Sequence, residues 1–317
     1  MGTDEMDGRE AGTGAAAGTE ALAGAGCAGA DVTRTEAAGA GEGGAQDGEL
    51  LAALRDRSAT YELLARLMGR EVDVELLAGL RAMGWAAMAD AAGTPTDGAD
   101  AAAGISAAGA NAAAGCGAGA GMEAGADGAQ AVFAAPVCEA ELLGSGARLI
   151  GDYLAQHPAS DDEATCTELA VDFARLFVVR SRSEKHAAYP FESVYTSEGH
   201  HTMDRARDEV RALYRAAGLA RDERWNVGED HVALELEFMA ELSRRAEAAC
   251  ACGDDAALDD VLRRQASFLD AHLLSWVGLL AQAMEAVAHT PFYRGLARFL
   301  VGWLRDDRTF LRAALGA

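Results

Sequence analysis

Apolar residues recur along this chain mainly at spacings of three and four positions, which is the period of an α-helix. Between residues 50 and 68, the large apolar side chains return at intervals near three, four and seven positions. Leu234, Phe238 and Leu242 repeat at every fourth position. No segment shows the sustained alternation of apolar and polar residues that is typical of a strand. The pattern predicts an all-α protein, a compact helical bundle, with helices over residues 49–69, 71–89, 139–156, 160–179, 203–217, 230–249, 254–288 and from 291 onward.

Residues that favour helix ends support these boundaries. We expect Asp254 or Asp255 to cap the long helix near the C-terminal end. Thr290 precedes Pro291, and proline is common at the first helical position because its missing N–H would have no partner there. Gly69 is a suitable end for the first helix.

Two segments, residues 1–48 and 90–136, consist largely of Gly, Ala and small polar residues. Such segments cannot bury enough apolar surface to offset the entropy of ordering the chain. We therefore predict a disordered acidic tail and a disordered internal insert. The remaining sequence divides into a helical N-terminal subdomain over residues 49–228, which contains the insert, and a helical C-terminal subdomain over residues 229–317.

The formal net charge is −23, with 50 acidic and 27 basic residues. Binding to nucleic acid phosphates needs a basic surface, so we expect no nucleic-acid partner. An acidic protein instead suits a partner with clustered arginine residues. The first residues lack the apolar segment of a secretory signal, and the longest apolar run, residues 273–284, is too short to cross a bilayer. We expect a soluble, cytoplasmic protein without stable membrane insertion.

The sequence carries none of the common catalytic motifs for metalloproteases, serine hydrolases or phosphate-loop enzymes. The six cysteines include no CxxC pair, and Cys250 and Cys252 are the only close pair. His200 and His201 lie in a predicted loop, where a metal site would need further ligands. We predict no enzymatic activity, no cofactor and no metal. An enzymatic or metal-binding bundle that uses these four residues stays as an alternative, which metal analysis of the purified protein would test.

Two short motifs offer candidate binding chemistry. Residues 189–195 are rich in aromatic side chains for a loop, and they either anchor the loop on the helices or take part in binding. Asp230 and His231 begin a predicted helix. In the structural interpretation Asp230 caps this helix, and His231 faces a neighbouring element or Glu235 one turn later. In the functional interpretation the Asp-His pair is a recognition site beside the preceding connector.

These motifs, in this order, resemble the TorD/DmsD branch of redox-enzyme maturation chaperones, which is related to the nitrate reductase delta-subunit-like proteins. The resemblance covers residues 139–317 well and the helices at 49–89 more loosely. The stretches that carry it are Phe-Ala-Arg-Leu-Phe at 173–177, Pro-Phe-Glu-Ser-Val-Tyr at 190–195, Asp-His at 230–231, Leu-Glu-Leu-Glu-Phe-Met at 234–239 and Phe-Leu-Asp-Ala-His-Leu at 268–273.

The chain departs from the family pattern at the connector. The family often carries Glu-Pro ahead of the Asp-His pair, where this sequence has Val227 and Gly228, followed by Glu229. We therefore expect a more flexible connector. The tail and the insert have no counterpart in the family pattern.

The resemblance implies binding rather than catalysis. Such chaperones bind the twin-arginine signal peptide of a molybdopterin oxidoreductase precursor, usually of the dimethyl-sulfoxide-reductase type. They also contact the apoenzyme and delay its export until the cofactor is inserted. A helix-lined groove would suit the apolar stretch of the peptide, and carboxylates such as Glu192, Asp230 or Glu237 would suit its arginines. The implied signal-peptide and client-binding residues are Tyr189, Pro190, Glu192, Ser193, Tyr195, Asp230, His231, Glu237 and Phe238.

Two questions stay open at this point. A delta-subunit-like assembly factor for a membrane-bound nitrate reductase or a related enzyme is the alternative function. The sequence is also compatible with either a monomer or a homodimer.

Overall fold

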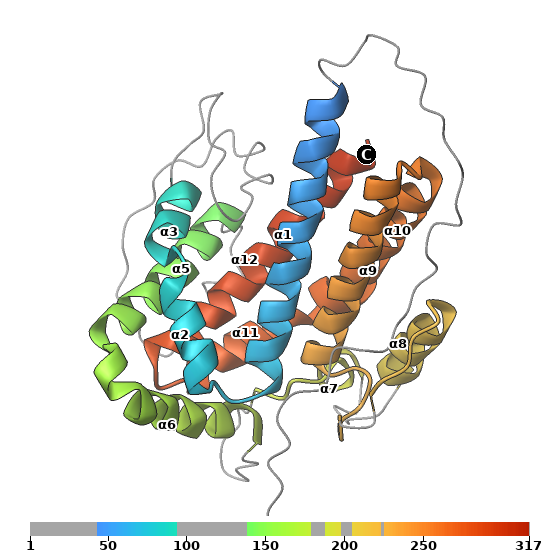
Figure 1. Cartoon of the computed structure of the whole chain (residues 1–317). Coiled ribbons are helices and arrows are strands. Elements are labelled where there is room, and N and C mark those ends of the chain that lie inside the picture. The colour runs from blue at the N-terminus through green and yellow to red at the C-terminus, as the bar shows by residue number, and fades with distance from the viewer. Residues whose placement is uncertain (1–42, 94–137, 179–187, 198–204, 223–224, 317) are drawn as a thin grey trace, which may run out of the picture. The chain divides into compact units, whose positions relative to one another are not determined.

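The computed structural model describes residues 43–93, 138–178, 188–197, 205–222 and 225–316 (Figure 1). In this part of the chain every regular element is a helix, and extended pairing is limited to one isolated bridge between Phe191 and His231. The predicted all-α class is confirmed. Most of the predicted tail and insert lies outside the described residues, and the portions that are described, 43–48 and 90–93, are helical.

The helices of the described residues vary in length from three to 27 residues. In order, they are α1 (Gly43–Gly69), α2 (Val74–Ala82), α3 (Trp85–Gly93), α5 (Glu139–Gln156), η2 (Ala159–Asp161), α6 (Asp162–Phe173), η3 (Ala174–Val178), α7 (Glu192–Thr196), α8 (Arg205–Ala216), α9 (Val232–Cys252), α10 (Asp255–Phe268), η4 (Leu269–Leu273), α11 (Leu274–Val287) and α12 (Pro291–Ala314).

Some helices have the predicted bounds and some do not. Helix α5 has the predicted limits, whereas α1 begins at Gly43 rather than at residue 49. The single helix predicted over residues 71–89 is two helices, α2 and α3, because Met83 between them is extended. The indole N–H of Trp85 donates to the carbonyl of Leu80 at 2.7 Å, and this bond stabilises the break.

The C-terminal third also differs in detail from the prediction. The long helix expected over residues 254–288 is interrupted by the π-helical turn η4, and the last part of the chain is the single helix α12. The predicted caps are confirmed. Asp254 accepts a hydrogen bond from the backbone N–H of Ala257 at 3.0 Å, and Thr290 caps α12 with Pro291 as its first residue.

Helices that are distant in sequence pack side by side. Helix α1 lies along α9, and α5 lies along α12, while α10 and α11 pack against α9 and α12 respectively (Figure 1). The first two pairings cross the subdomain boundary predicted at residue 228. Within the described part of the chain, no helix combines the length and the apolar character that crossing a membrane would require.

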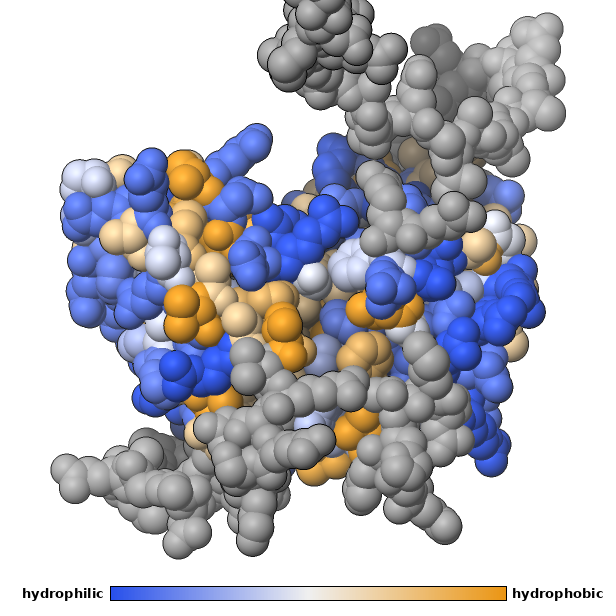
Figure 2. Space-filling view, turned by 90° about the horizontal axis from the view of Figure 1, so that it is seen from below, coloured by the Kyte–Doolittle hydropathy of each residue, from blue (hydrophilic) through white to orange (hydrophobic). Residues whose placement is uncertain are grey.

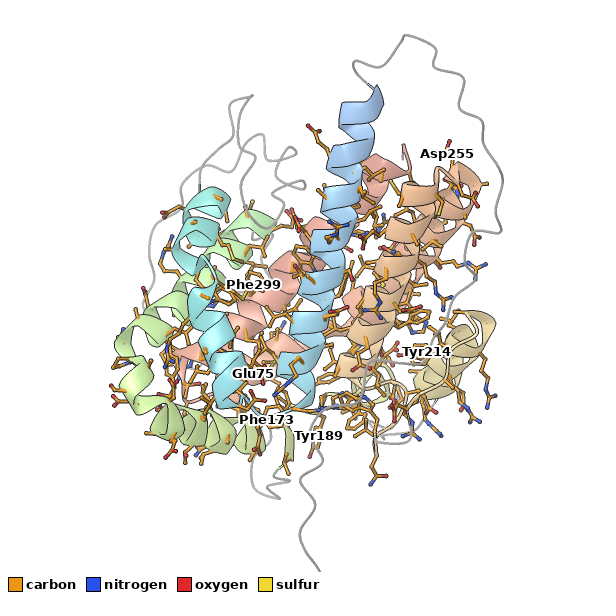
Figure 3. All side chains as sticks on the ribbon, viewed as in Figure 1. Glu75, Phe173, Tyr189, Tyr214, Asp255 and Phe299 are labelled. Atoms are coloured by element: carbon orange, nitrogen blue, oxygen red, sulfur yellow. The ribbon has the colours of Figure 1, made fainter. Side chains whose placement is uncertain are left out.

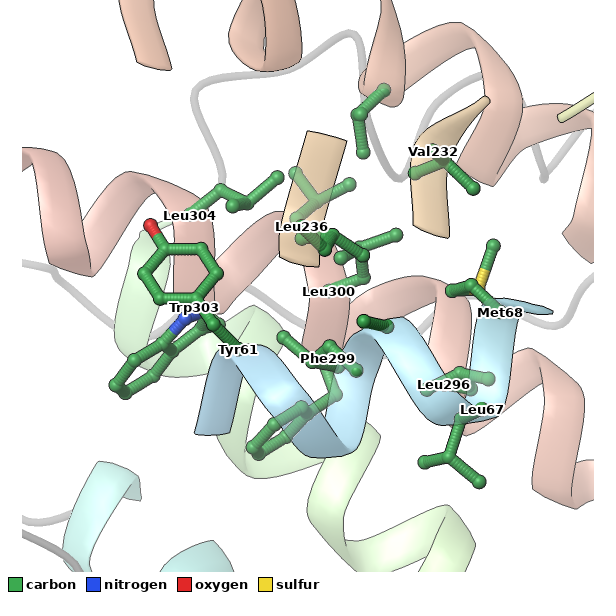
Figure 4. Packing of buried hydrophobic residues seen from close by; sticks show 14 of the residues in the cluster. Tyr61, Leu67, Met68, Val232, Leu236, Leu296, Phe299, Leu300, Trp303 and Leu304 are labelled. Atoms are coloured by element: carbon green, nitrogen blue, oxygen red, sulfur yellow. The ribbon is translucent and has the colours of Figure 1, made fainter. Parts of the chain in front are cut away.

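Large apolar side chains from α1, α9 and α12 fill the space between these helices. Tyr61 and Met68 of α1 meet Leu236 of α9, and Phe299 and Leu300 of α12 (Figure 4). All five are almost completely buried. Burial of a side chain of this size stabilises a fold by about 1.5–3 kcal/mol, so this cluster is a main source of stability.

A buried ion pair and its hydrogen-bond partners connect α1, α10 and α12. Arg57 of α1 pairs with Asp307 of α12, with one bond from Nη2 to Oδ2 at 3.0 Å. The hydroxyl of Tyr61 donates to the same Asp307 oxygen at 2.5 Å, and Arg57 also donates to Gln265 of α10. Burial raises the pKa of Tyr61 well above its ordinary value, and the Asp307 charge raises it further, so the hydroxyl keeps its proton and acts as a donor.

Glycines allow α5 and α12 to approach closely. A Cβ atom at Gly146 would lie 2.6 Å from the backbone nitrogen of Phe299 and 2.7 Å from the carbonyl oxygen of Gly295. A Cβ atom at Gly302 would lie 2.7 Å from the backbone nitrogen of Leu143. Because the obstructing atoms are backbone, the two helices cannot keep this separation if a side chain is added.

We expect Gly146→Ala to lower the free energy of unfolding by about 1–3 kcal/mol, the usual cost of overpacking a core. The matched control is Gly79→Ala in α2, where a Cβ atom would meet nothing within 4 Å. That change should raise the stability by about 0.5–1 kcal/mol, since alanine is the better helix former. Chemical denaturation measures both, and equal effects would contradict the close approach of α5 and α12.

Candidate functional site

The two motifs singled out in the sequence meet in the structure. Phe191 and His231 form an antiparallel bridge. The backbone N–H of Val232 donates to the carbonyl of Pro190, and that of Glu192 donates to the carbonyl of Asp230, both at 2.9 Å. The aromatic loop therefore docks on the N-terminal end of α9. Tyr189 and Tyr214 lie at this end of the bundle (Figure 3).

The Asp-His pair caps two different helices. Oδ2 of Asp230 accepts hydrogen bonds from the backbone N–H of Ser193, at 3.1 Å, and from the Ser193 hydroxyl. Asp230 therefore satisfies the first turn of α7, and the prediction that it caps the helix beginning at residue 230 was wrong. His231 caps that helix, since its Nδ1 accepts from the backbone N–H of Ala233 at 3.1 Å. Burial lowers the pKa of His231 to about 4, so the ring is neutral near pH 7 and can accept this bond.

The residues just before this pair are held by specific contacts. A Cβ atom at Gly228 would lie 2.6 Å from Oδ1 of Asp230, so glycine leaves the space that this carboxylate occupies. Glu229 accepts a hydrogen bond from Arg207 of α8 at 2.7 Å, and Tyr214 of α8 donates to its carbonyl at 3.3 Å. These contacts fix residues 228–231, the end of the connector that was expected to be flexible.

A buried polar cluster lies beneath the loop. Nδ1 of His272 lies 2.9 and 3.2 Å from the two carboxylate oxygens of Glu192. Glu235 of α9 accepts a hydrogen bond from the indole N–H of Trp276 at 3.2 Å and is 0% exposed. Burial raises the pKa of Glu235 well above its ordinary value, and the neighbouring charges of Glu192 and Asp230 raise it further. Burial also raises the pKa of Asp230, against the hydrogen bonds from Ser193.

Four half-buried aromatic residues belong to the loop and to the connector before α9, and we call them the aromatic rim: Tyr189, Phe191, Tyr195 and Trp225. The edge of Phe191 meets the His231 ring with centroids 5.0 Å apart, and Trp225 lies 6.1 Å from the same ring. Tyr195 stacks on Trp276 at 5.5 Å. The rim thus presents aromatic surface above a polar interior.

The predicted binding residues divide into a buried and a more exposed group. Tyr189 and Tyr195 are half-buried, and Glu237 is exposed on α9. Phe238 is buried and packs against Tyr214 at 4.7 Å and Phe268 at 4.8 Å. The remaining predicted residues are buried where the aromatic loop meets the N-terminal end of α9. They are Pro190, Glu192, Ser193, Asp230 and His231. Binding by these residues stays a prediction.

Sequence reasoning did not name four residues of this region as site residues, although it considered Glu235 as a partner of His231: Trp225, Glu235, His272 and Trp276. Glu235 and His272 stand at positions where the helical period calls for apolar core residues, and this was the available signal. The histidines of the metal-site alternative, at 200 and 201, lie outside the described residues. Among the described residues, no group of three or more His, Cys, Asp or Glu side chains could hold a metal ion.

We expect Glu235→Gln to flatten the dependence of stability on pH. The folded protein keeps the Glu235 proton, whereas the unfolded chain loses it above its ordinary pKa of 4.5. The free energy of unfolding should therefore fall as pH rises above the ordinary pKa of 4.5, by up to about 1.4 kcal/mol per pH unit, and glutamine removes this contribution.

Denaturation between about pH 5 and pH 8 measures the difference. Glu141→Gln, at an exposed position of α5, is the matched control and should leave the slope unchanged. Parallel curves for the wild type and Glu235→Gln would show that Glu235 is ionised in the folded protein.

Comparison with known proteins identifies relatives of this central part of the chain. Residues 139–282 match the family described as nitrate reductase delta subunit. A protein named chaperone protein TorD from Photobacterium profundum is 30% identical over 144 residues, which are 45% of this chain and 64% of that protein. A TorD protein from Vibrio cholerae is 32% identical over 141 residues, 44% of this chain and 61% of its own length. The chain thus spans just under two thirds of these relatives, and the resemblance to the TorD/DmsD family is confirmed over this part.

Proposed function

Because residues 139–282 match the nitrate reductase delta subunit family and a TorD chaperone is 30% identical over 144 residues, we propose that this chain is a maturation chaperone for a redox enzyme. In this proposal it acts in the cytoplasm and binds the twin-arginine signal peptide and the apo form of a molybdopterin oxidoreductase of the dimethyl-sulfoxide-reductase type. It holds the precursor until the cofactor is inserted, and it makes or breaks no covalent bond itself.

The observation that carries the proposal is the meeting of the two family motifs at the aromatic rim. The rim offers partly exposed aromatic side chains on a backbone that is fixed by the bridge between Phe191 and His231. Aromatic side chains bring a large apolar area to an interface and lose little entropy on binding. This surface suits the apolar stretch of a signal peptide.

Charge would supply the second part of the recognition. Glu192 and Asp230 already bind His272 and Ser193 inside the protein, so they could reach a peptide only if these contacts broke. Glu237 is exposed on the second turn of α9, so a guanidinium group can approach its carboxylate from solvent.

The lower face of the molecule offers further apolar surface. Hydrophobic residues are spread across the middle of this face, with hydrophilic residues on both sides (Figure 2). Elsewhere on the described chain, exposed large apolar residues include Val178 of η3 and Leu279 of α11. Such surface would suit contacts with an apoenzyme in addition to its signal peptide.

The family match favours a second candidate function. Because the matching family is described as nitrate reductase delta subunit, an assembly factor for a membrane-bound nitrate reductase or a related enzyme is the alternative. Co-purification from the native host separates the two. The first proposal expects a precursor with a twin-arginine leader, and the second expects a catalytic subunit without an exported signal.

We expect Tyr189→Ala and Glu237→Gln each to weaken binding of a twin-arginine peptide by about tenfold, or about 1.4 kcal/mol. The first removes apolar contact area, and the second removes a charge-assisted hydrogen bond to arginine. Isothermal titration calorimetry with a synthetic peptide that contains both arginines and the apolar stretch measures the effect.

Matched controls keep this test specific. Val171→Ala removes a 56% exposed apolar residue on α6, and Glu141→Gln removes an exposed carboxylate on α5, so neither should change the affinity. A peptide with both arginines replaced by lysine should bind the wild type more weakly. Equal binding of the two peptides would contradict twin-arginine recognition.

A further inference from the structure

Glu192 connects three elements at the base of the loop. Its backbone N–H donates to Asp230 at the start of α9, and its carboxylate accepts from His272 on η4. Glu235 of α9 is close enough to Glu192 for the two carboxyl groups to interact. Glu192 is 4% exposed and His272 is 6% exposed, so both act on the chain itself rather than on a ligand in solvent.

We propose that Glu192, His272 and Glu235 are positioning residues that latch α7 onto α9 and η4, and that the aromatic rim faces a client only while this latch is closed. The second half of this inference rests on the proposed binding function. The latch itself is a property of the chain alone.

The geometry makes α7 depend on these side chains. Helix α7 has five residues, too few to be stable by itself. Other anchors of this segment among the described residues include the backbone bonds to residues 230 and 232, the Asp230 cap and the stack of Tyr195 on Trp276. His272 approaches from a π-helical turn, an irregularity that often marks functional positions in helices.

In the closed latch, Glu235 keeps its proton near pH 7. Glu192 and Asp230 bring two carboxylates close to Glu235, and Oε1 of Glu235 is buried with no hydrogen-bond partner among the described residues. Tyr214 of α8 also lies close to Glu235. His272 binds Glu192, which in turn lies beside Glu235. His231 is neutral near pH 7. If Glu235 loses its proton, like charges meet in a space that excludes water. The latch should therefore loosen as pH rises.

Hydrogen exchange of the full chain without any client tests the latch directly. In Glu192→Ala and in His272→Ala, the amides of residues 191–197 should exchange about tenfold faster or more, whereas those of α5 and α12 should keep their wild-type protection. Glu285→Ala is the control. Glu285 lies near the C-terminal end of α11 and pairs with Arg298 of α12, so its loss should leave the exchange of the loop amides unchanged. Unchanged loop exchange in both latch variants would overturn the proposal.

A conservative variant separates positioning from general damage. Glu192→Gln retains an oxygen that can accept from His272 and removes the charge that faces Glu235. We expect its loop to stay as protected as in the wild type at low pH, with loop exchange that no longer increases with pH after correction for the intrinsic rate. Loss of protection throughout α5 and α12 would show that Glu192 stabilises the whole fold, and it would overturn the positioning role.

Peptide affinity tests the link to binding. With a twin-arginine peptide, the wild-type affinity should fall as pH rises, Glu235→Gln should abolish this fall, and His272→Ala should bind about tenfold more weakly at every pH. Faster loop exchange in His272→Ala together with unchanged affinity would overturn the dependence of the rim on the latch. If the wild type binds no such peptide while the exchange results hold, the proposed function fails and the latch stands.

Discussion

The candidate site of this molecule depends on one constraint, which is that polar groups buried between α7, α9 and η4 must find partners inside the protein. Asp230, Glu235 and Glu192 are withdrawn from water, where an unpaired charge would cost several kcal/mol. Each is accommodated by a neighbour or by a retained proton. The position of the aromatic loop therefore depends on side chains of α9 and η4 as well as on its own residues.

The helical bundle that supports the aromatic loop is stabilised by contacts that do not involve α7. The Arg57–Asp307 pair joins α1 to α12, and the glycine contact of Gly146 with Gly295 joins α5 to α12. Neither interaction includes a residue of α7 or of the connector before α9. Because the bundle has its own core and its own buried ion pair, a loop held by a few polar contacts can move while the helices stay folded.

The sequence predicted what local physics determines and missed what distant contacts determine. Helical periodicity identified α5 with its bounds, and cap chemistry identified Asp254 and Thr290. The break before α3 was missed because it depends on where the Trp85 ring packs. The role of Asp230 was misassigned because its partner is Ser193, 37 positions away, and no periodicity reports such a pair.

In the candidate site, too, the sequence indicated the segments but not the contacts that each residue makes. The resemblance directed attention to two segments that the structure brings together at the bridge. The resemblance could not tell a carboxylate that meets a client from one that holds the loop in place. Glu192 and Glu237 are both acidic residues in family-like stretches, yet one is paired with His272 in the interior and the other is exposed on α9. In the proposed latch, a motif residue serves binding without touching the ligand, because the surface it supports depends on its own buried contact.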